Sequence, residues 1–378
     1  MIDLIKKLSA EPRVPTSTFT INCIEYLSEK LDSCGYNTTL FSSNLQKWRS
    51  IADPFLELCY DGDTSKKIIP LTSATYSQST PSSGVIGRVI VSEKITMLDS
   101  FEWDSFVILD EISKKPTGQL IFTDYGSMPQ PLPKNKSDIP TAIIPSNYIG
   151  EIKTFINNER SSVGILHVQT ENFGESIIPS LIVSPSDTSD PIPLVCAHID
   201  TIHNSPGAHD NASGVAVAFE LAKFCAKNNI PCNFAFFNGE ESNKVASSHY
   251  VQQLKSNDLL GKFNLVIEID SVGIGNQISL LCSKKLRKKL RNLNWGLDLY
   301  PGFDMDINPQ SKICFSDVWP FMQNGIPVIR MLSRDTVNRL DQVVMHTEND
   351  THEKLNGTTL SFALNAAKVI LQSEINTN

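Results

Sequence analysis

The sequence predicts an α/β protein with a mixed, largely parallel central sheet, flanked by helices and interrupted by a β-rich inserted domain. From residue 176 to the C-terminus, apolar runs of strand length alternate with helical segments, as in domains built on buried parallel strands. Between residues 72 and 171, short β-type runs alternate with Pro, Gly, Ser and Asn clusters. The length of 378 residues suits two domains or one domain with an insertion, at roughly 150 residues each.

The N-terminal region is predicted to hold one amphipathic helix. Thr16 or Ser17 is placed to cap it, and apolar residues recur at helical spacing from Phe19 to Leu31. Gly35 stands where a helix C-terminus favours glycine. A polar, turn-rich segment follows near residues 61–63. We therefore expect residues 1–71 to form the N-terminal part of a catalytic domain, residues 72–171 the insertion, and residues 172–378 the main part.

The β-rich insertion is expected to be compact. Its predicted strands lie at residues 85–91, 106–109, 120–122, 141–144 and 164–168. A proline-rich loop is expected at residues 128–133.

The C-terminal region alternates strands and helices. Strands are predicted at residues 193–199, 233–237, 263–269 and 327–332, and helices at residues 211–228, 247–254 and 358–371. Ligand sites in parallel sheets lie at the carboxyl ends of the strands. The chemically informative residues should therefore be found there.

Composition excludes several classes of protein. Lys and Arg total 33 against 41 Asp and Glu, a formal net charge of −8, which argues against binding nucleic acid through phosphate neutralisation. The basic run at residues 284–291 is interpreted as the solvated face of a short helix. No apolar stretch reaches the ~18 residues of a membrane span, and the N-terminus lacks a signal-peptide pattern. The oligomeric state is left open.

The eight cysteines are scattered, without a C-x-x-C pair, and several lie inside apolar runs. This distribution predicts buried free thiols in a reducing compartment. We therefore expect a cytoplasmic protein.

Acidic residues and histidines follow the apolar runs at five places. Each has an ordinary explanation by itself: Asp210 could cap a helix, and adjacent glutamates are commonly a solvated pair. Together, two histidines and three carboxylates make a ligand set suited to zinc. A zinc pair needs one carboxylate to bridge it, which leaves one further glutamate as a base. The five places are His198-Ile-Asp200, Asp210, Glu240-Glu241, Asp270 and His346.

The order of these motifs resembles the cocatalytic-zinc exopeptidases of the leucyl aminopeptidase and glutaminyl cyclase type, metallopeptidase family twenty-eight. The motifs are H-x-D at 198–200, G-A-x-D-N-x-S-G at 207–214, E-E at 240–241, D at 270, S-D-x-x-P-F at 316–321 and H-T at 346–347. The likeness extends from about residue 176 to the C-terminus and more weakly to the N-terminal helix. It implies the zinc aminopeptidase form of the predicted fold. The insertion resembles the protease-associated domain of some relatives in position, size and strand content.

The resemblance implies two zinc ions per chain and a role for each residue. His198 and Asp270 would bind one ion, Glu241 and His346 the other, and Asp210 would bridge the two. Asp200 would orient the His198 imidazole. Glu240 would be the general base that activates a metal-bridging water for peptide-bond hydrolysis. The implied function is a zinc-dependent exopeptidase, an aminopeptidase acting on peptides.

Two features depart from the family pattern, and other functions stay open. The common S-D-H reads Ser316-Asp317-Val318 here, and residues 313–315 lack the tyrosine that some members use to stabilise an oxyanion. One alternative is a glutaminyl cyclase-like acyltransferase with a single zinc, and another is a catalytically inactive binding protein of the same fold. The substrate side chain and the end of the peptide attacked are not determined by the sequence. Zincin, Walker and G-x-S-x-G motifs are absent.

Overall fold

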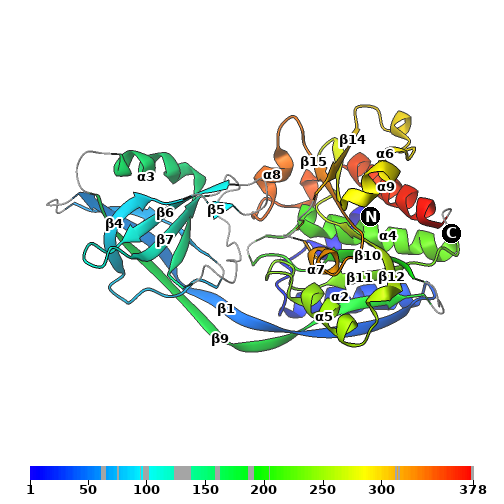
Figure 1. Ribbon diagram of the computed structural model, residues 1–378, viewed down its shortest axis with the longest axis horizontal. Coiled ribbons are helices and arrows are strands. Elements are labelled where there is room, and N and C mark those ends of the chain that lie inside the picture. Colours follow the sequence, from blue (N-terminus) through cyan, green and yellow to red (C-terminus); the bar gives the residue numbers. More distant parts are fainter. Residues whose placement is uncertain are drawn as a thin grey trace. The chain divides into compact units, whose positions relative to one another are not determined.

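A computed structural model describes residues 1–60, 65–74, 76–93, 95–96, 102–122, 138–157, 162–185, 191–203, 205–310, 313 and 316–375. The chain forms two compact units: the first comprises Met1–Leu45 and Ser176–Asn378, and the second Gln46–Glu175. Two long strands, β1 (Asn37–Tyr60) and β9 (Ser162–Ser184), contribute residues to both units. Figure 1 labels the elements.

The first unit holds the central sheet and its helices. Its strands are β10 (Ile192–His198), β11 (Asn233–Phe237), β12 (Phe263–Ile269), β13 (Gln277–Cys282), β14 (Asp304–Pro309) and β15 (Val328–Arg334). Its helices are α1 (Ile2–Leu8), α2 (Thr18–Asp32), α4 (Gly214–Lys227), α5 (Val245–Ser256), α6 (Arg287–Arg291), α7 (Trp319–Gln323), α8 (Leu340–Val344) and α9 (Gly357–Ile375).

The sheet of the first unit runs in the order β14-β13-β15-β12-β10-β11-β9. The four neighbours β15, β12, β10 and β11 are parallel, whereas β13 is antiparallel to β15 and β9 is antiparallel to β11. This arrangement confirms the predicted mixed, largely parallel sheet. The parallel strands bring their carboxyl ends to one edge of the sheet.

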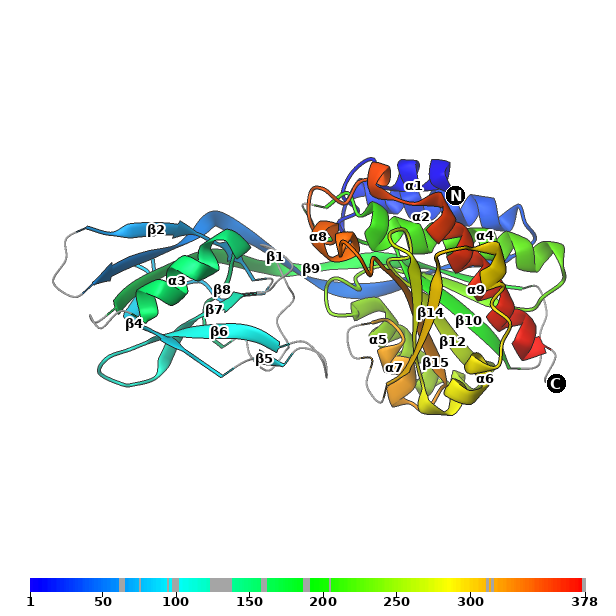
Figure 2. The same ribbon diagram turned by 90° about the horizontal axis from the view of Figure 1, so that it is seen from above.

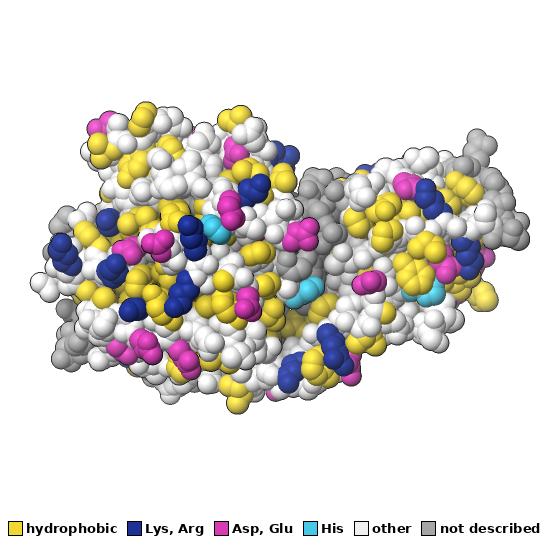
Figure 3. Space-filling view, turned by 180° about the vertical axis from the view of Figure 1, so that it is seen from behind, with side chains coloured by type: hydrophobic (Ala, Val, Ile, Leu, Met, Phe, Trp, Pro, Cys, Tyr) yellow, Lys and Arg dark blue, Asp and Glu magenta, His cyan; other side chains and the backbone are white. Residues whose placement is uncertain are grey.

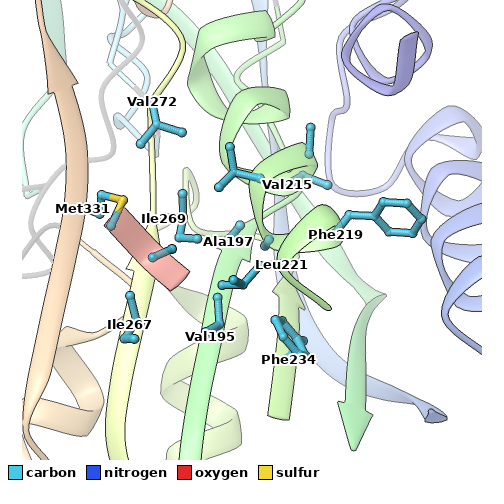
Figure 4. Close-up of a cluster of buried hydrophobic side chains, with 14 of the residues drawn as sticks. Val195, Ala197, Val215, Phe219, Leu221, Phe234, Ile267, Ile269, Val272 and Met331 are labelled. Carbon is cyan, nitrogen blue, oxygen red and sulfur yellow. The ribbon is translucent and has the colours of Figure 1, made fainter. Parts of the chain in front are cut away.

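Helices cover both faces of this sheet (Figure 2). Alternate residues of β10 show why the strand is apolar throughout: Val195 and Ala197 pack in one core with α4 and α9, and Leu194 and Cys196 pack in another with α5 and α7. Figure 4 shows the first core, where side chains of α4 such as Val215 and Leu221 lie over the strands. The two cores fix the strand ends from both sides.

The local elements follow the sequence pattern closely. Helix α2 begins after Ser17, whose hydroxyl accepts a hydrogen bond from the Thr20 N–H. Strands β11 and β12 have the predicted bounds, and α4, α5, α9, β10 and β15 differ from prediction by a few residues at their ends. Strands β13 and β14 were not predicted; β14, at the edge of the sheet, alternates exposed and half-buried residues and carries no continuous apolar run.

The second unit is β-rich, as predicted. Its elements are β2 (Lys67–Pro70), β3 (Thr72–Ser73), β4 (Val85–Val91), β5 (Ile95–Thr96), β6 (Glu102–Leu109), β7 (Pro116–Phe122), β8 (Thr141–Ile144) and helix α3 (Ile149–Ile156). Its sheet continues from β9 in the order β4-β6-β7-β8-β3, with antiparallel pairs except for β7 and β8.

The boundary of the second unit differs from the expected 72–171. Residues 46–71 belong to it, because β1 pairs with β2 from Phe55 to Leu58, and Leu56 and Ile69 lie in its core. The sequence does not reveal this boundary, because β1 is one long strand whose first residues belong to the first unit and whose later residues belong to the second. The likeness to a protease-associated domain stays a prediction, and the proline-rich loop at 128–133 lies outside the described residues.

Surface charges of both signs are interspersed on the face of the first unit drawn in Figure 3. The basic run at 284–291 forms a 3-10 turn and the short helix α6, where Leu290 is buried and the lysines and arginines are exposed or half-buried. This agrees with a solvated helix face. Among the described residues, no helix has the length and apolar character needed to cross a membrane.

Candidate metal centre

The predicted site residues come from the carboxyl ends of the central strands. His198 is the last residue of β10, and Asp270 directly follows β12. Glu240 and Glu241 lie just after β11, and Asp210 lies in the turn Ala208–Ser213 that leads into α4. His346 follows α8. Apolar strands therefore end where the polar cluster begins.

The His198 imidazole is oriented by the chain and directed at two carboxylates. Its Nδ1 donates to the backbone oxygen of Asp200 at 3.1 Å, since a carbonyl can only accept. Its Nε2 lies 3.0 Å from Oδ1 of Asp210 and 3.3 Å from Oδ1 of Asp270. The His198 side chain is 2% exposed.

The His346 imidazole mirrors this arrangement on the other side of Asp210. Its Nε2 lies 2.9 Å from Oδ2 of Asp210 and 3.1 Å from Oε1 of Glu241. Asp210 thus turns one carboxylate oxygen to each histidine. His198, Asp210 and Glu241 also place their ligand atoms within 4.8 Å of one another. The structure brings all five predicted ligands together.

The cluster shifts the pKa values of its members. Burial alone would lower the pKa of His198, but the carboxylates of Asp200, Asp210 and Asp270 raise it well above its usual value. The pKa of His346 is raised in the same way by Glu241 and Asp210. Conversely, although burial would raise it, the two histidines hold the pKa of Asp210 well below its usual range.

Two carboxylates of the cluster differ in their surroundings. Burial raises the pKa of Glu241 to about 7, against the effect of His346. Burial would also raise the pKa of Asp270, but Arg330 and His198 bring it to about 2.

The two adjacent glutamates are held by Asp200. Its Oδ1 accepts the backbone N–H of Glu240 at 3.1 Å, and its Oδ2 accepts that of Glu241 at 3.1 Å. Its carboxylate lies 3.8 Å from Nδ1 of His198. Glu240 is partly exposed, and burial raises the pKa of its carboxyl, while His198 and Lys244 lower it. Asp200 therefore fixes the backbone of both glutamates as well as adjoining the imidazole.

The sequence reasoning missed the residues that surround the ligands. Arg330, in the middle of β15, donates to Oδ2 of Asp270 from both Nε (3.1 Å) and Nη2. Its Nε also lies 3.7 Å from Glu268, its partner in the register of β12 and β15. Glu268 in turn accepts hydrogen bonds from the Ser316 hydroxyl and the Asp317 N–H. The sequence does offer one signal for these contacts: Glu268 and Arg330 are charged residues inside two predicted apolar strands.

The donor set fits a divalent metal. A neutral His198 that donates through Nδ1 has a lone pair at Nε2, facing the lone pairs of two carboxylates. Likewise, Oε1 of Glu241 is buried without a hydrogen-bond partner among the described residues, although Nε2 of His346 lies 3.1 Å away. A cation between these atoms would give each nitrogen and oxygen lone pair a partner. Imidazole nitrogen with carboxylate oxygen is a donor set that zinc accepts.

Comparison with known proteins identifies a family for this chain. Residues 181–370, half of the chain, match the family model described as Peptidase family M28. An "Aminopeptidase" of Pseudomonas aeruginosa is 37% identical over 86 residues, which cover 22% of this chain and 16% of that relative. The matched segment thus spans far less than two thirds of the relative's length.

Solved structures resemble the chain over nearly its whole length. An aminopeptidase from Aneurinibacillus sp. strain AM-1 superposes with a TM-score of 0.72 at 18% identity, covering 98% of this chain and 92% of that one. BSAP, a zinc aminopeptidase from Bacillus subtilis, has a TM-score of 0.66 at 19% identity, covering 100% and 94%. These likenesses establish the fold.

Fold and cluster together define an α/β protein with a buried histidine–carboxylate centre at the carboxyl edge of its sheet. The chain belongs to peptidase family M28.

Proposed function

We propose that the protein is a zinc-dependent exopeptidase, an aminopeptidase that releases N-terminal residues from peptides. One observation carries the proposal: Asp210 turns one oxygen to Nε2 of His198 and the other to Nε2 of His346. Each histidine also contacts a second carboxylate, Asp270 or Glu241. Membership of the family and the name of the Pseudomonas aeruginosa relative support peptide hydrolysis at the N-terminus.

The same symmetry supports a site for two zinc ions per chain. His198 and Asp270 would hold one ion, Glu241 and His346 the other, and Asp210 would contribute to both. Zinc supplies Lewis acidity, which polarises a peptide carbonyl and makes water more acidic. This donor set leaves Glu240 without a metal to bind, although it lies next to Glu241.

Glu240 is the residue we assign as general base. It takes the proton from the attacking water and later gives it to the leaving amine. Burial raises the pKa of this carboxyl, which makes the glutamate a better proton acceptor. Asp200 contributes by holding the Glu240 backbone N–H at 3.1 Å.

The proposal is tested on the purified protein with a mixture of peptides, by mass spectrometry of the products and metal analysis of the same sample. We expect stepwise loss of N-terminal residues, about two zinc ions per chain, and loss of activity on chelation that added zinc restores. Full activity in thoroughly metal-free protein would contradict the proposal. Release of ammonia from N-terminal glutamine without loss of a residue would favour the glutaminyl cyclase-like alternative.

The base is separated from the ligands by a matched pair of variants. Glu240→Gln keeps the side-chain shape but cannot accept the proton, so turnover should fall about 10²–10⁴-fold with zinc content unchanged. Glu241→Gln should lose zinc. If Glu240→Gln loses zinc or keeps near-normal turnover, the two roles are assigned wrongly.

We also propose a reducing, cytoplasmic location. The seven cysteines within the described residues are free, and most of them are buried; Cys314 lies outside the described residues. All eight thiols should react with a thiol reagent after unfolding without reductant. Two or more native disulfides in protein isolated with thiols blocked would contradict this location.

A further inference from the structure

The N-terminal segment places a fully buried arginine beside the metal centre. Arg13 has 0% of its surface exposed, although it lies on neither a helix nor a strand. Its guanidinium makes no ion pair with a carboxylate among the described residues. It donates instead to four backbone oxygens: Nε to Ile199 at 2.7 Å, Nη1 to Leu8 at 2.7 Å and Pro206 at 2.9 Å, and Nη2 to Gly207 at 2.8 Å.

Three of these oxygens belong to the connection that runs from the end of β10 to α4 and carries Asp210. Ile199 directly follows His198, and Gly207 lies three residues before Asp210. A planar guanidinium presents its N–H groups in a fixed fork. Because that fork contacts both ends of this connection at once, it sets the separation of the residue next to His198 from the turn that carries Asp210.

The backbone of Arg13 is attached to the same place. Its N–H donates to the Thr201 hydroxyl at 2.8 Å, and its C=O accepts the Thr201 N–H at 3.0 Å. Two residues later, Pro15 O accepts a hydrogen bond from the Asn238 side chain at 3.0 Å. The N-terminal segment therefore contacts the loops after β10 and β11.

A buried carboxylate holds the Asp210 turn from its other side. Oδ1 of Asp350 accepts the His209 N–H at 2.6 Å, and Oδ2 accepts the Asp210 N–H at 3.0 Å. Arg13 thus binds carbonyls of the turn while Asp350 binds its N–H groups. Asp350 resembles Asp200, which holds the N–H groups of Glu240 and Glu241 in the same way.

The turn at Gly207 packs so tightly against Arg13 that its backbone has no room to change conformation. Gly207 has a φ of +61°, a left-handed conformation that favours glycine. A Cβ there would collide with the Thr201 side chain and the Asp210 oxygen, and would lie 3.1 Å from Nη2 of Arg13. Loss of the arginine would therefore leave buried carbonyls without donors in a turn whose conformation is sharply restricted.

We propose that Arg13 is a positioning residue of the metal centre, which together with Asp350 holds Asp210 between His198 and His346. The proposal rests on the zinc centre described above. It assigns to residues 13–15, outside the segment matched by the family model, a part in the site that was predicted from residues 198–346. Burial removes a guanidinium from water at a large cost in free energy, so a chain that needed only an anchor for its N-terminus would not require one here.

The test measures zinc binding by calorimetry on metal-depleted protein, apart from peptidase turnover. Arg13→Lys keeps the charge but cannot donate to Ile199 and Gly207 at once, and Arg13→Met removes the charge. Since removal of groups that orient metal ligands weakens metal affinity or activity about 10–100-fold, we expect zinc affinity to fall in that range for both variants. Turnover should fall through kcat, with KM little changed.

The matched control is Lys7→Met. Lys7 is exposed on α1 and lies 3.6 Å from the centre of the Tyr26 ring of α2, so its loss loosens the N-terminal segment away from the metal centre. It should leave zinc affinity unchanged. Asp350→Asn should weaken zinc affinity as Arg13→Lys does, and the combined variant should lose less than the product of the two effects, because both act on one turn.

Each outcome decides the proposal. Unchanged zinc affinity and kcat in a folded Arg13→Lys protein would overturn it. An Arg13→Lys protein that does not unfold cooperatively would also overturn it, because Arg13 would then be required for the whole fold. Absence of zinc binding by the unmodified protein would instead overturn the proposed function itself, on which this inference depends.

Discussion

His198 and His346 reach the same carboxylate, Asp210, from different kinds of structure. His198 ends a central strand that is buried throughout, its Nδ1 is hydrogen-bonded to a backbone oxygen, and its side chain is 2% exposed. His346 follows the five-residue helix α8, has a φ of +58°, and its side chain is 14% exposed. The acid partners differ similarly: Asp270 follows β12 directly, whereas Glu241 lies in the turn after β11.

This difference separates the rigid part of the centre from the adaptable part. We call His198 with Asp270 the strand half, and His346 with Glu241 the loop half. Arg330 and the Ser271 hydroxyl also hold the carboxylate of Asp270 in the strand half. A ligand held by its neighbours loses less freedom on binding. We therefore expect the strand half to bind zinc more tightly than the loop half.

The largest effect should come from the carboxylate that the halves share. Asp210→Ala removes an oxygen from each histidine at once, so both halves should lose zinc and turnover should become undetectable. Metal analysis after dialysis checks this, with the exposed Asp298→Ala as control. Retention of one zinc ion would show that the halves bind independently and that Asp210 is not shared.

The next effect should separate the halves. His346→Ala should retain about one zinc ion per chain, because His198, Asp270 and Asp210 remain. His198→Ala should bind zinc weakly at both positions, since it removes the ligand of the more ordered half. Zinc titration of the two variants compares them directly. Equal losses would mean that burial and strand position do not determine affinity here.

A smaller effect, on stability, should come from Arg330 of the strand half. Arg330→Met leaves the buried carboxylate of Asp270 without the guanidinium that pairs with it, and breaking such a buried pair costs about 3–5 kcal/mol. Urea unfolding of metal-free protein measures the loss. Arg334→Met on the same strand is the control, because Arg334 is more exposed and lies 3.4 Å from Asp341; its loss should be smaller. Similar losses for both variants would contradict a special role for Arg330.

A further effect on stability should be its dependence on pH. Asp317 is buried, its Oδ1 accepts the Ser247 hydroxyl at 2.5 Å, and burial and Glu240 raise its pKa to about 8. The native state thus keeps a proton that the unfolded chain releases near pH ~4. The free energy of unfolding should therefore fall as pH rises from about 4 to 8, by up to about 1.4 kcal/mol per pH unit from this group.

Asp317→Asn replaces the carboxyl group with an amide that does not titrate, so this position no longer binds or releases a proton. Metal-free Asp317→Asn should match the unmodified protein near pH ~4 and become increasingly more stable than it toward pH ~8. Urea unfolding at several pH values checks the difference. Parallel curves for the two proteins would show that Asp317 is already ionised at neutral pH.

The sequence by itself predicted much of the local structure and a set of candidate ligands. Predominantly apolar runs such as residues 263–269 are typical of buried strands or helices, and their length and flanking turns indicate strands. A parallel sheet then gathers the residues that follow each strand at one edge. That rule predicts that His198, Asp210, Glu241 and Asp270 lie close together.

Tertiary structure alone decided which groups support those ligands. Arg13 is 185 residues from His198 in the chain, and nothing in its local sequence shows that its guanidinium binds the carbonyls of Ile199 and Gly207. Arg330 and Glu268 interrupt apolar strands, but only the register of β12 and β15 makes them partners. Likewise, no local sequence pattern marks the point at which β1 leaves the first unit and enters the second. Backbone and charge contacts between distant segments depend on the folded path of the chain, whereas periodicity reports only on near neighbours.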